Sequence, residues 1–76
     1  MRSKLDQVRD AWAAGDRIAA LRIASRFHDR SPETRAFQRG HQAVLHPEFF
    51  RRLGRDPEAL TAAALDALAR KFNLPT

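Results

Sequence analysis

The stretch that decides the fold is SRFHDRSPETRAFQRG, residues 25–40. It holds the end of one apolar helical pattern and the start of another. Ser31, Pro32 and Glu33 together signal a helix start, because a hydroxyl can cap free N–H groups, proline suits the first turn and an acid suits the positive end of a helix. Arginines recur in this stretch every four or five residues. Two interpretations follow: a DNA-binding helix-turn-helix, or an ordinary bend between two helices with charged outer faces.

Upstream of this stretch, apolar residues recur at helical spacing in two segments, residues 4–14 and 17–28. Gly15 and Asp16 separate the segments, since glycine suits a left-handed helix end and aspartate can cap the next helix. The buried stripes expected for the two segments consist of Leu5, Val8, Ala11, Trp12, Ile18, Leu21, Ala24 and Phe27. The pattern therefore predicts two helices before the deciding stretch.

Downstream, the third helix is expected to run from the Ser31 cap to about Leu45. Its inner face consists of Phe37, Gly40, His41 and Val44. A glycine in the middle of a helix costs up to ~1 kcal/mol relative to alanine. We therefore interpret Gly40 as the mark of a close crossing with another helix.

Two more helical segments complete the chain. PEFFRRLG, residues 47–54, is expected to form a short helical turn, and DPE at 56–58 repeats the order of cap, proline and acid. The last helix is expected over residues 57–72. Because no segment alternates as a strand does and the loops are tight, the sequence predicts an all-α fold: a compact bundle of four helices plus one short helical turn, in a single domain over residues 1–76.

The net charge of +5 is confined to one segment of the chain. Residues 22–55 carry eight arginines against three acids, whereas the rest of the chain is neutral. The arginines are Arg22, Arg26, Arg30, Arg35, Arg39, Arg51, Arg52 and Arg55. A genome that prefers arginine to lysine explains the choice of residue, at 12 to 2, but explains the clustering less well. The regional excess therefore favours a binding surface over general solubility.

As a helix-turn-helix, the deciding stretch would place Ser31, Glu33, Thr34 and Arg35 where base edges are read in the major groove. The fit has faults, because the turn HDR lacks the usual glycine and apolar residue, and Arg35 lies where an inward apolar side chain is expected. An ordinary helical hairpin accounts better for the geometry alone. Nucleic-acid contact does not depend on the motif, because clustered arginines bind phosphates without regard to base sequence.

The aromatic pair Phe49 and Phe50 is a candidate hot spot for a partner. Adjacent residues of a helical turn point in different directions, and the pair is followed by Arg51 and Arg52. Aromatic and arginine side chains carry most of the energy of protein interfaces. The default expectation is nevertheless that both rings are buried in the core.

Catalysis and metal binding are not expected. His28 and Asp29 near Ser25 have the residue types of a catalytic triad, but Ser25 and His28 share one turn and no glycine-rich elbow presents a nucleophile. His41 and His46 are five residues apart, and there is no cysteine to complete a metal site. No phosphate-loop or dinucleotide fingerprint occurs in the sequence. We therefore expect a non-enzymatic protein with no metal and no cofactor.

No segment has the pattern of a signal peptide or a membrane span. The N-terminus, MRSKLDQVRDAW, is charged throughout. The longest apolar run, AAAL, is far shorter than the ~20 residues that cross a bilayer. We therefore expect a cytoplasmic protein that makes no membrane contact.

The pattern VRDAWAAGDRIAALRIASRF, followed by HPEFFRRLGRDPEAL, resembles small uncharacterised all-helical proteins encoded in bacterial prophages. The resemblance covers most of the chain and implies a phage-type context, with no functional residues to carry over. Phage proteins of this size include DNA-packaging and regulatory binders, and inhibitors of host machinery such as anti-CRISPR proteins.

Three hypotheses about function follow. In the first, the basic segment 22–55 contacts DNA or a nucleoprotein complex. In the second, the protein is an inhibitor or adaptor that binds an acidic protein surface of a host complex through Phe49, Phe50 and nearby arginines. In the third, it is a small structural or DNA-packaging subunit that forms a homo-oligomer.

Overall fold

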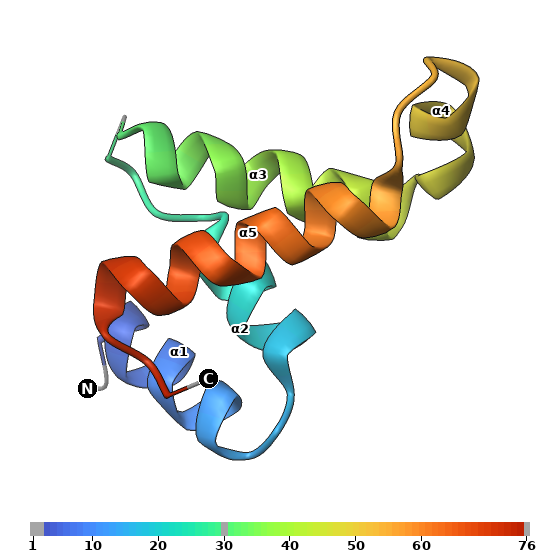
Figure 1. The fold of residues 1–76 in the computed structure, drawn as a ribbon. Coiled ribbons are helices and arrows are strands. Elements are labelled where there is room, and N and C mark those ends of the chain that lie inside the picture. Colours follow the sequence, from blue (N-terminus) through green and yellow to red (C-terminus); the bar gives the residue numbers. More distant parts are fainter. Residues whose placement is uncertain (1–2, 30, 76) are drawn as a thin grey trace.

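The computed structural model describes residues 3–29 and 31–75. This part of the chain forms five helices and no strand (Figure 1): α1 (Lys4–Ala13), α2 (Arg17–Ala24), α3 (Pro32–Leu45), α4 (Pro47–Arg52) and α5 (Pro57–Phe72). α4 has only six residues, whereas the other helices have at least eight. The structure therefore confirms the prediction of an all-α fold with four helices and one short helical turn.

Each of the four longer helices begins at a residue whose side chain caps it. These residues are Ser3, Asp16, Ser31 and Asp56, which accept hydrogen bonds from backbone N–H groups in the first turns of α1, α2, α3 and α5. α3, α4 and α5 also begin with a proline, where the missing N–H group needs no partner. Local chemistry therefore sets where the helices begin.

The long helices α3 and α5 run antiparallel and lie side by side, and α4 forms the tip that joins them (Figure 1). α1 and α2 form a second hairpin. α2 packs against both α3 and α5, near the middle of the pair (Figure 1). The molecule measures 41 × 26 × 20 Å, and α4 projects at one end of it.

The core lies where the two hairpins meet. Its buried cluster consists of Val8, Trp12, Ala20, Leu21, Ala24, Phe37, Ala64, Leu68, Ala69 and Leu74. Phe37 and Leu21 are the largest fully buried side chains. The inner stripes predicted for α1, α2 and α3 supply five of these ten residues, because their apolar residues recur at the helical period. Ile18, which was also expected to be buried, is exposed.

Gly40 lies at a close approach of α3 to α5. A Cβ atom at this position would overlap the Cβ of Ala64 and would lie 3.3 Å from the carbonyl oxygen of Leu60. Leu21 of α2 reaches the same place, with its Cδ2 atom 3.6 Å from that Cβ position. The structure therefore confirms that Gly40 marks a helix crossing.

The prediction that the second helix continues to residue 28 is wrong, because α2 ends at Ala24. The Ser25 hydroxyl donates to the Arg22 carbonyl at 2.7 Å, and the Arg26 and Phe27 N–H groups each bond a carbonyl three residues back. These tighter bonds end the α-helix. Phe27 is still half-buried, since its ring packs edge-on against Phe72 with centroids 5.6 Å apart.

The residues after α5 fold back onto the core. Asn73 takes the left-handed conformation (φ 54°), and the Leu74 N–H group donates to the Ala69 carbonyl. This turn buries Leu74, and the indole N–H of Trp12 donates to the Pro75 carbonyl. The tail therefore closes the core from the side of α1.

Candidate nucleic-acid interface

Arg22 of α2 and Arg26 of the turn that follows it are both exposed, and α2 packs against α3. Burial lowers the pKa of His41 below its ordinary value, and the positive charges of Arg22 and Arg26 lower it further. The imidazole of α3 is therefore close enough to both guanidinium groups to respond to their charge. Nearby, the Gln38 amide donates to the Ser25 carbonyl at 3.4 Å, which joins α3 to the end of α2.

Arg35 and Arg39 are also exposed, but they lie further around α3. At 100° per residue they are about 120° and about 160° from His41. They line a hollow between α3 and α5, together with Leu60 and Ala63. Arg22 and Arg26 therefore lie on one flank of the exposed face of α3, and Arg35 and Arg39 on the other.

Neutral amides occupy the middle of this face. Gln38 and Gln42 fall about 60° and about 100° around α3 from His41, between the two arginine pairs. We call this surface the basic strip; it consists of Arg22, Arg26, Arg35, Gln38, Arg39, His41 and Gln42. Three members were not among the candidate site residues predicted from the sequence: Gln38, His41 and Gln42. His41 was expected on the inner face of α3 but is only half-buried, whereas the position of Gln38 between two arginines of the same helix was a signal.

The acids of the basic segment are held at the two ends of α3 and do not pair with the strip. Asp29 and Glu33 pair with Lys71, and Glu48 pairs with Arg51. No ion pair in the described part of the chain involves the four arginines of the strip. The strip is therefore a positive surface whose charge is not neutralised by neighbouring carboxylates.

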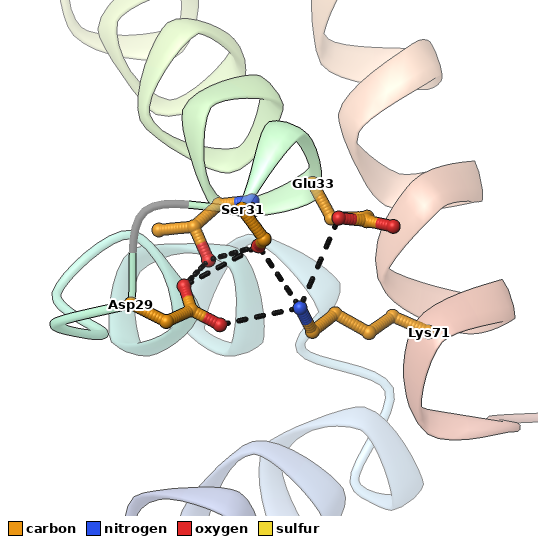
Figure 2. Close-up of polar contacts among 5 residues, drawn as sticks. Asp29, Ser31, Glu33 and Lys71 are labelled. Carbon is orange, nitrogen blue, oxygen red and sulfur yellow. Dashed lines mark hydrogen bonds and ion pairs between the residues drawn. The ribbon is translucent and has the colours of Figure 1, made fainter.

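A polar network around Lys71 fixes the N-terminal end of α3 (Figure 2). The Lys71 ammonium group lies 3.2 Å from Asp29 Oδ2, 3.0 Å from Ser31 Oγ and 3.9 Å from Glu33 Oε2. The Thr34 hydroxyl donates to Asp29, and Ser31 Oγ accepts from the Thr34 N–H group at 3.2 Å. The network joins the last turn of α5 to the first turn of α3, so Ser31 already has structural partners.

Stability at low pH should depend on this network. The Thr34 hydroxyl holds the pKa of Asp29 below its ordinary value of 3.8, and Lys71 acts in the same direction. A lowered carboxyl pKa stabilises the fold at neutral pH, and this contribution disappears as the pH falls through the folded-state value. Asp29→Asn should therefore be less stable than wild type at neutral pH, and the gap should close as the pH falls below the ordinary value of 3.8 and through the lowered pKa of Asp29. Urea unfolding at several pH values measures the gap.

A second variant tests the assigned cause. Thr34→Val keeps the shape of the buried side chain but removes the hydroxyl donor. The pKa of Asp29, followed by carboxyl carbon NMR, should rise in this variant. A stability gap between wild type and Asp29→Asn that stayed constant with pH would contradict the prediction.

The structure does not have the arrangement of a helix-turn-helix. α2 ends at Ala24 and α3 begins at Pro32, which is further than the 3–4-residue turn of that motif allows. Of the residues expected at the reading edge, Thr34 is buried and Ser31 is engaged in the Lys71 network. Arg35 points to solvent instead of inward. The hairpin interpretation therefore describes this part of the chain.

The remaining predicted arginines lie outside the strip. Arg51 pairs with Glu48 and, at 2.8 Å, with Glu58, and the hydrogen bond with Glu48 is the main reason that the pKa of Arg51 is raised. Arg51 therefore holds α4 against α5. Arg52 and Arg55 are exposed and form no ion pair within residues 3–29 and 31–75. Arg30 lies outside the described residues.

The expectation that Phe49 and Phe50 are both buried is wrong. Phe49 is 58% exposed and Phe50 is half-buried. Their rings meet edge to face, with centroids 5.4 Å apart and planes at 88°. With Gln42 and His46, the two rings line an open hollow of about 350 Å³. The reason for the exposure is that α4 projects at the end of the α3–α5 pair, beyond the part that α2 covers (Figure 1).

Comparison with known proteins assigns no family to the chain. No protein-family model matches the chain, and neither a curated protein nor a solved structure matches it. The resemblance to prophage proteins therefore stays a prediction.

In the part of the chain that the structure describes, no three His, Cys, Asp or Glu side chains are grouped to hold a metal ion. Within the same residues, no helix is both long enough and apolar enough to cross a membrane.

Proposed function

We propose that this protein is a non-enzymatic binding protein that contacts nucleic acid through the basic strip on α2, the turn after it, and α3. The observation that carries the proposal is the separation of charges on this surface. Four exposed arginines flank the exposed face of α3, while the acids of the same segment are paired at the two ends of this helix. Phosphates bind such unpaired guanidinium groups with charge-assisted, often bidentate hydrogen bonds.

The middle of the strip also suits a nucleic-acid backbone. Gln38, His41 and Gln42 supply hydrogen-bonding groups without negative charge. Because the phosphate contacts carry no base information, binding through the strip would be insensitive to sequence and sensitive to salt. Free DNA and a nucleoprotein complex both present the phosphates that such binding requires.

The test is oligonucleotide binding by wild type and by Arg22→Ala/Arg39→Ala, which removes one arginine from each flank of the strip. Fluorescence anisotropy with a labelled random-sequence duplex at several salt concentrations gives the slope of log K against log salt. The slope for a duplex is about −0.9 per phosphate contact, so the double variant should lose roughly 2 units of slope if each arginine meets one phosphate. Its affinity at low salt should fall accordingly.

A matched control has the same change of charge elsewhere. Arg9→Ala/Arg70→Ala removes two exposed arginines outside the basic segment. This control should keep the wild-type slope. Equal losses in the two double variants would mean that only net charge matters, and no binding by wild type at low salt would eliminate the proposal.

A second candidate function is binding of a protein partner, and one observation favours it. An apolar groove of about 480 Å³ runs between α3, α4 and α5, lined by Val44, Pro57, Ala62 and Leu65 among others. Ala62 is exposed on the wall of this groove. If wild type binds no oligonucleotide, capture of an acidic host protein by wild type but not by Ala62→Glu would support an inhibitor or adaptor instead.

A further inference from the structure

We propose that the hollow at the junction of α3 and α4 holds an unpaired base, so that the protein prefers single-stranded nucleic acid to duplex. This inference rests on the proposed function, because the basic strip would supply the contacts to the phosphates. The hollow consists of Gln42, His46, Phe49 and Phe50.

The aromatic pair offers a surface for stacking. Phe49 is 58% exposed, and its contact with Phe50 holds the two rings perpendicular to each other. A ring that is already held in place loses little freedom when a base stacks on it. Exposed aromatic side chains beside cationic side chains are the usual stacking platforms of single-strand binding proteins. The volume of about 350 Å³ is at the lower end of the roughly 300–1,000 Å³ range of ligand sites, which suits one flat ring system.

The polar members of the hollow suit the edge of a base. The Gln42 side chain has both a donor and an acceptor, and the His46 ring has two nitrogen atoms that form hydrogen bonds. Unpaired bases are recognised by stacking together with hydrogen bonds to their free edges. In a duplex those edges are paired and the ring faces are stacked on neighbouring bases, so the same hollow cannot be filled.

Charge is placed on both sides of the hollow. Gln42 belongs to the basic strip and follows Arg39 by three residues on α3. On the other side, Arg52 follows Phe49 by three residues, is exposed and forms no ion pair within the described residues. Residues three apart on a helix are neighbours. The phosphates before and after a stacked base would therefore meet Arg39 and Arg52.

The experiment compares a labelled oligothymidine with a duplex of the same length, by fluorescence anisotropy at two salt concentrations. Wild type should bind the single strand more tightly. Phe49→Ala should weaken single-strand binding by about 5- to 150-fold, the effect of losing one base stack, and should leave duplex binding within about 2-fold. Phe49→Trp should keep the preference, because an indole ring also stacks.

Leu53→Ala provides the matched control, since Leu53 is also 58% exposed and lies at the end of the same short helix. Leu53→Ala should change neither the affinity for the single strand nor the affinity for the duplex. Circular dichroism of each variant confirms that the helices are retained. Equal effects of Leu53→Ala and Phe49→Ala would overturn the inference and favour an apolar protein partner at this end of the molecule.

The two proposals fail in different ways. If single strand and duplex bind equally and Phe49→Ala changes neither, the base site is refuted while the basic strip stands. If wild type binds neither oligonucleotide at low salt, both proposals are refuted together.

Discussion

Gly40→Ala is expected to lower the free energy of unfolding by about 2–3 kcal/mol, near the upper end of the cost of overpacking a core. In an ordinary helix the same change stabilises by up to ~1 kcal/mol, because alanine has the higher helix propensity. Here the new methyl group would overlap the Cβ of Ala64 and approach the Leu60 carbonyl, and neither atom belongs to a flexible side-chain end. The two helices must therefore move apart, which loosens the core. For a chain of 76 residues, each kcal/mol corresponds to a fall of roughly 4–8 °C in Tm.

A substitution at Ala64 tests whether the overlap between residues 40 and 64 causes the loss of stability. Ala64→Gly alone should destabilise by about 1 kcal/mol, because it places a glycine inside α5. Gly40→Ala/Ala64→Gly should then be more stable than the sum of the two single changes predicts, since the space lost on one helix is returned by the other. Urea unfolding of the four proteins gives this coupling energy. Strict additivity would show that the crossing tolerates a methyl group and would contradict the structure at this point.

Phe37→Ala is expected to cost about 3–5 kcal/mol, which is the range for removing a buried phenylalanine ring. Phe37 is fully buried, and its ring centroid lies 6.4 Å from that of Phe72. At roughly 0.05–0.15 kcal/mol per residue, a domain of this size has a total stability of about 4–11 kcal/mol. The variant should therefore be partly or wholly unfolded at 37 °C, as measured by circular dichroism and thermal unfolding.

Two controls separate ring loss from a general effect of substitution. Phe37→Leu keeps most of the volume and should cost less than about 1.5 kcal/mol. Phe49→Ala is the same chemical change at an exposed ring and should cost below about 1 kcal/mol. If Phe37→Ala were no more damaging than Phe49→Ala, the packing of α3 described above would be wrong.

The helix starts were predictable from sequence because the signals are local. The hydroxyl or carboxylate cap, the proline and the first-turn acid of α3 and α5 are adjacent in the chain, so no tertiary contact is needed to identify them. The role of Gly40 was predictable for a related reason, because a glycine that weakens its own helix indicates a compensating contact.

The end of α2 was not predictable from the apolar spacing. Phe27 continues the stripe of Leu21 and Ala24, and neither glycine nor proline marks a stop. The ring reaches the core from a turn instead of from the helix, and its partner Phe72 lies far away in the chain. Apolar periodicity therefore predicted that Phe27 packs onto the core but not the backbone conformation that brings it there.

The candidate site was predictable only in part. The sequence indicates that arginines cluster in residues 22–55, but not which of them are neutralised. Arg51 is paired with Glu58 of another helix, and Lys71 is paired with Asp29, which is 42 residues away in the chain. Such pairs between different helices depend on how the helices pack, and no spacing rule in the sequence specifies them. The exposure of Phe49 has the same origin, since it follows from how little of the α3–α5 pair α2 covers.

The contact between Trp12 and the C-terminal tail has a practical consequence for kinetics. Trp12 is the single tryptophan of the chain, its indole N–H donates to the Pro75 carbonyl, and the Arg17 guanidinium lies 4.7 Å from its ring centroid. One intrinsic chromophore therefore senses the first helix, the start of the second and the last described residues together. Stopped-flow fluorescence without any attached dye should time the docking of the tail, and circular dichroism should time helix formation independently. A difference between the two rates would show the order in which the ends of the chain are joined.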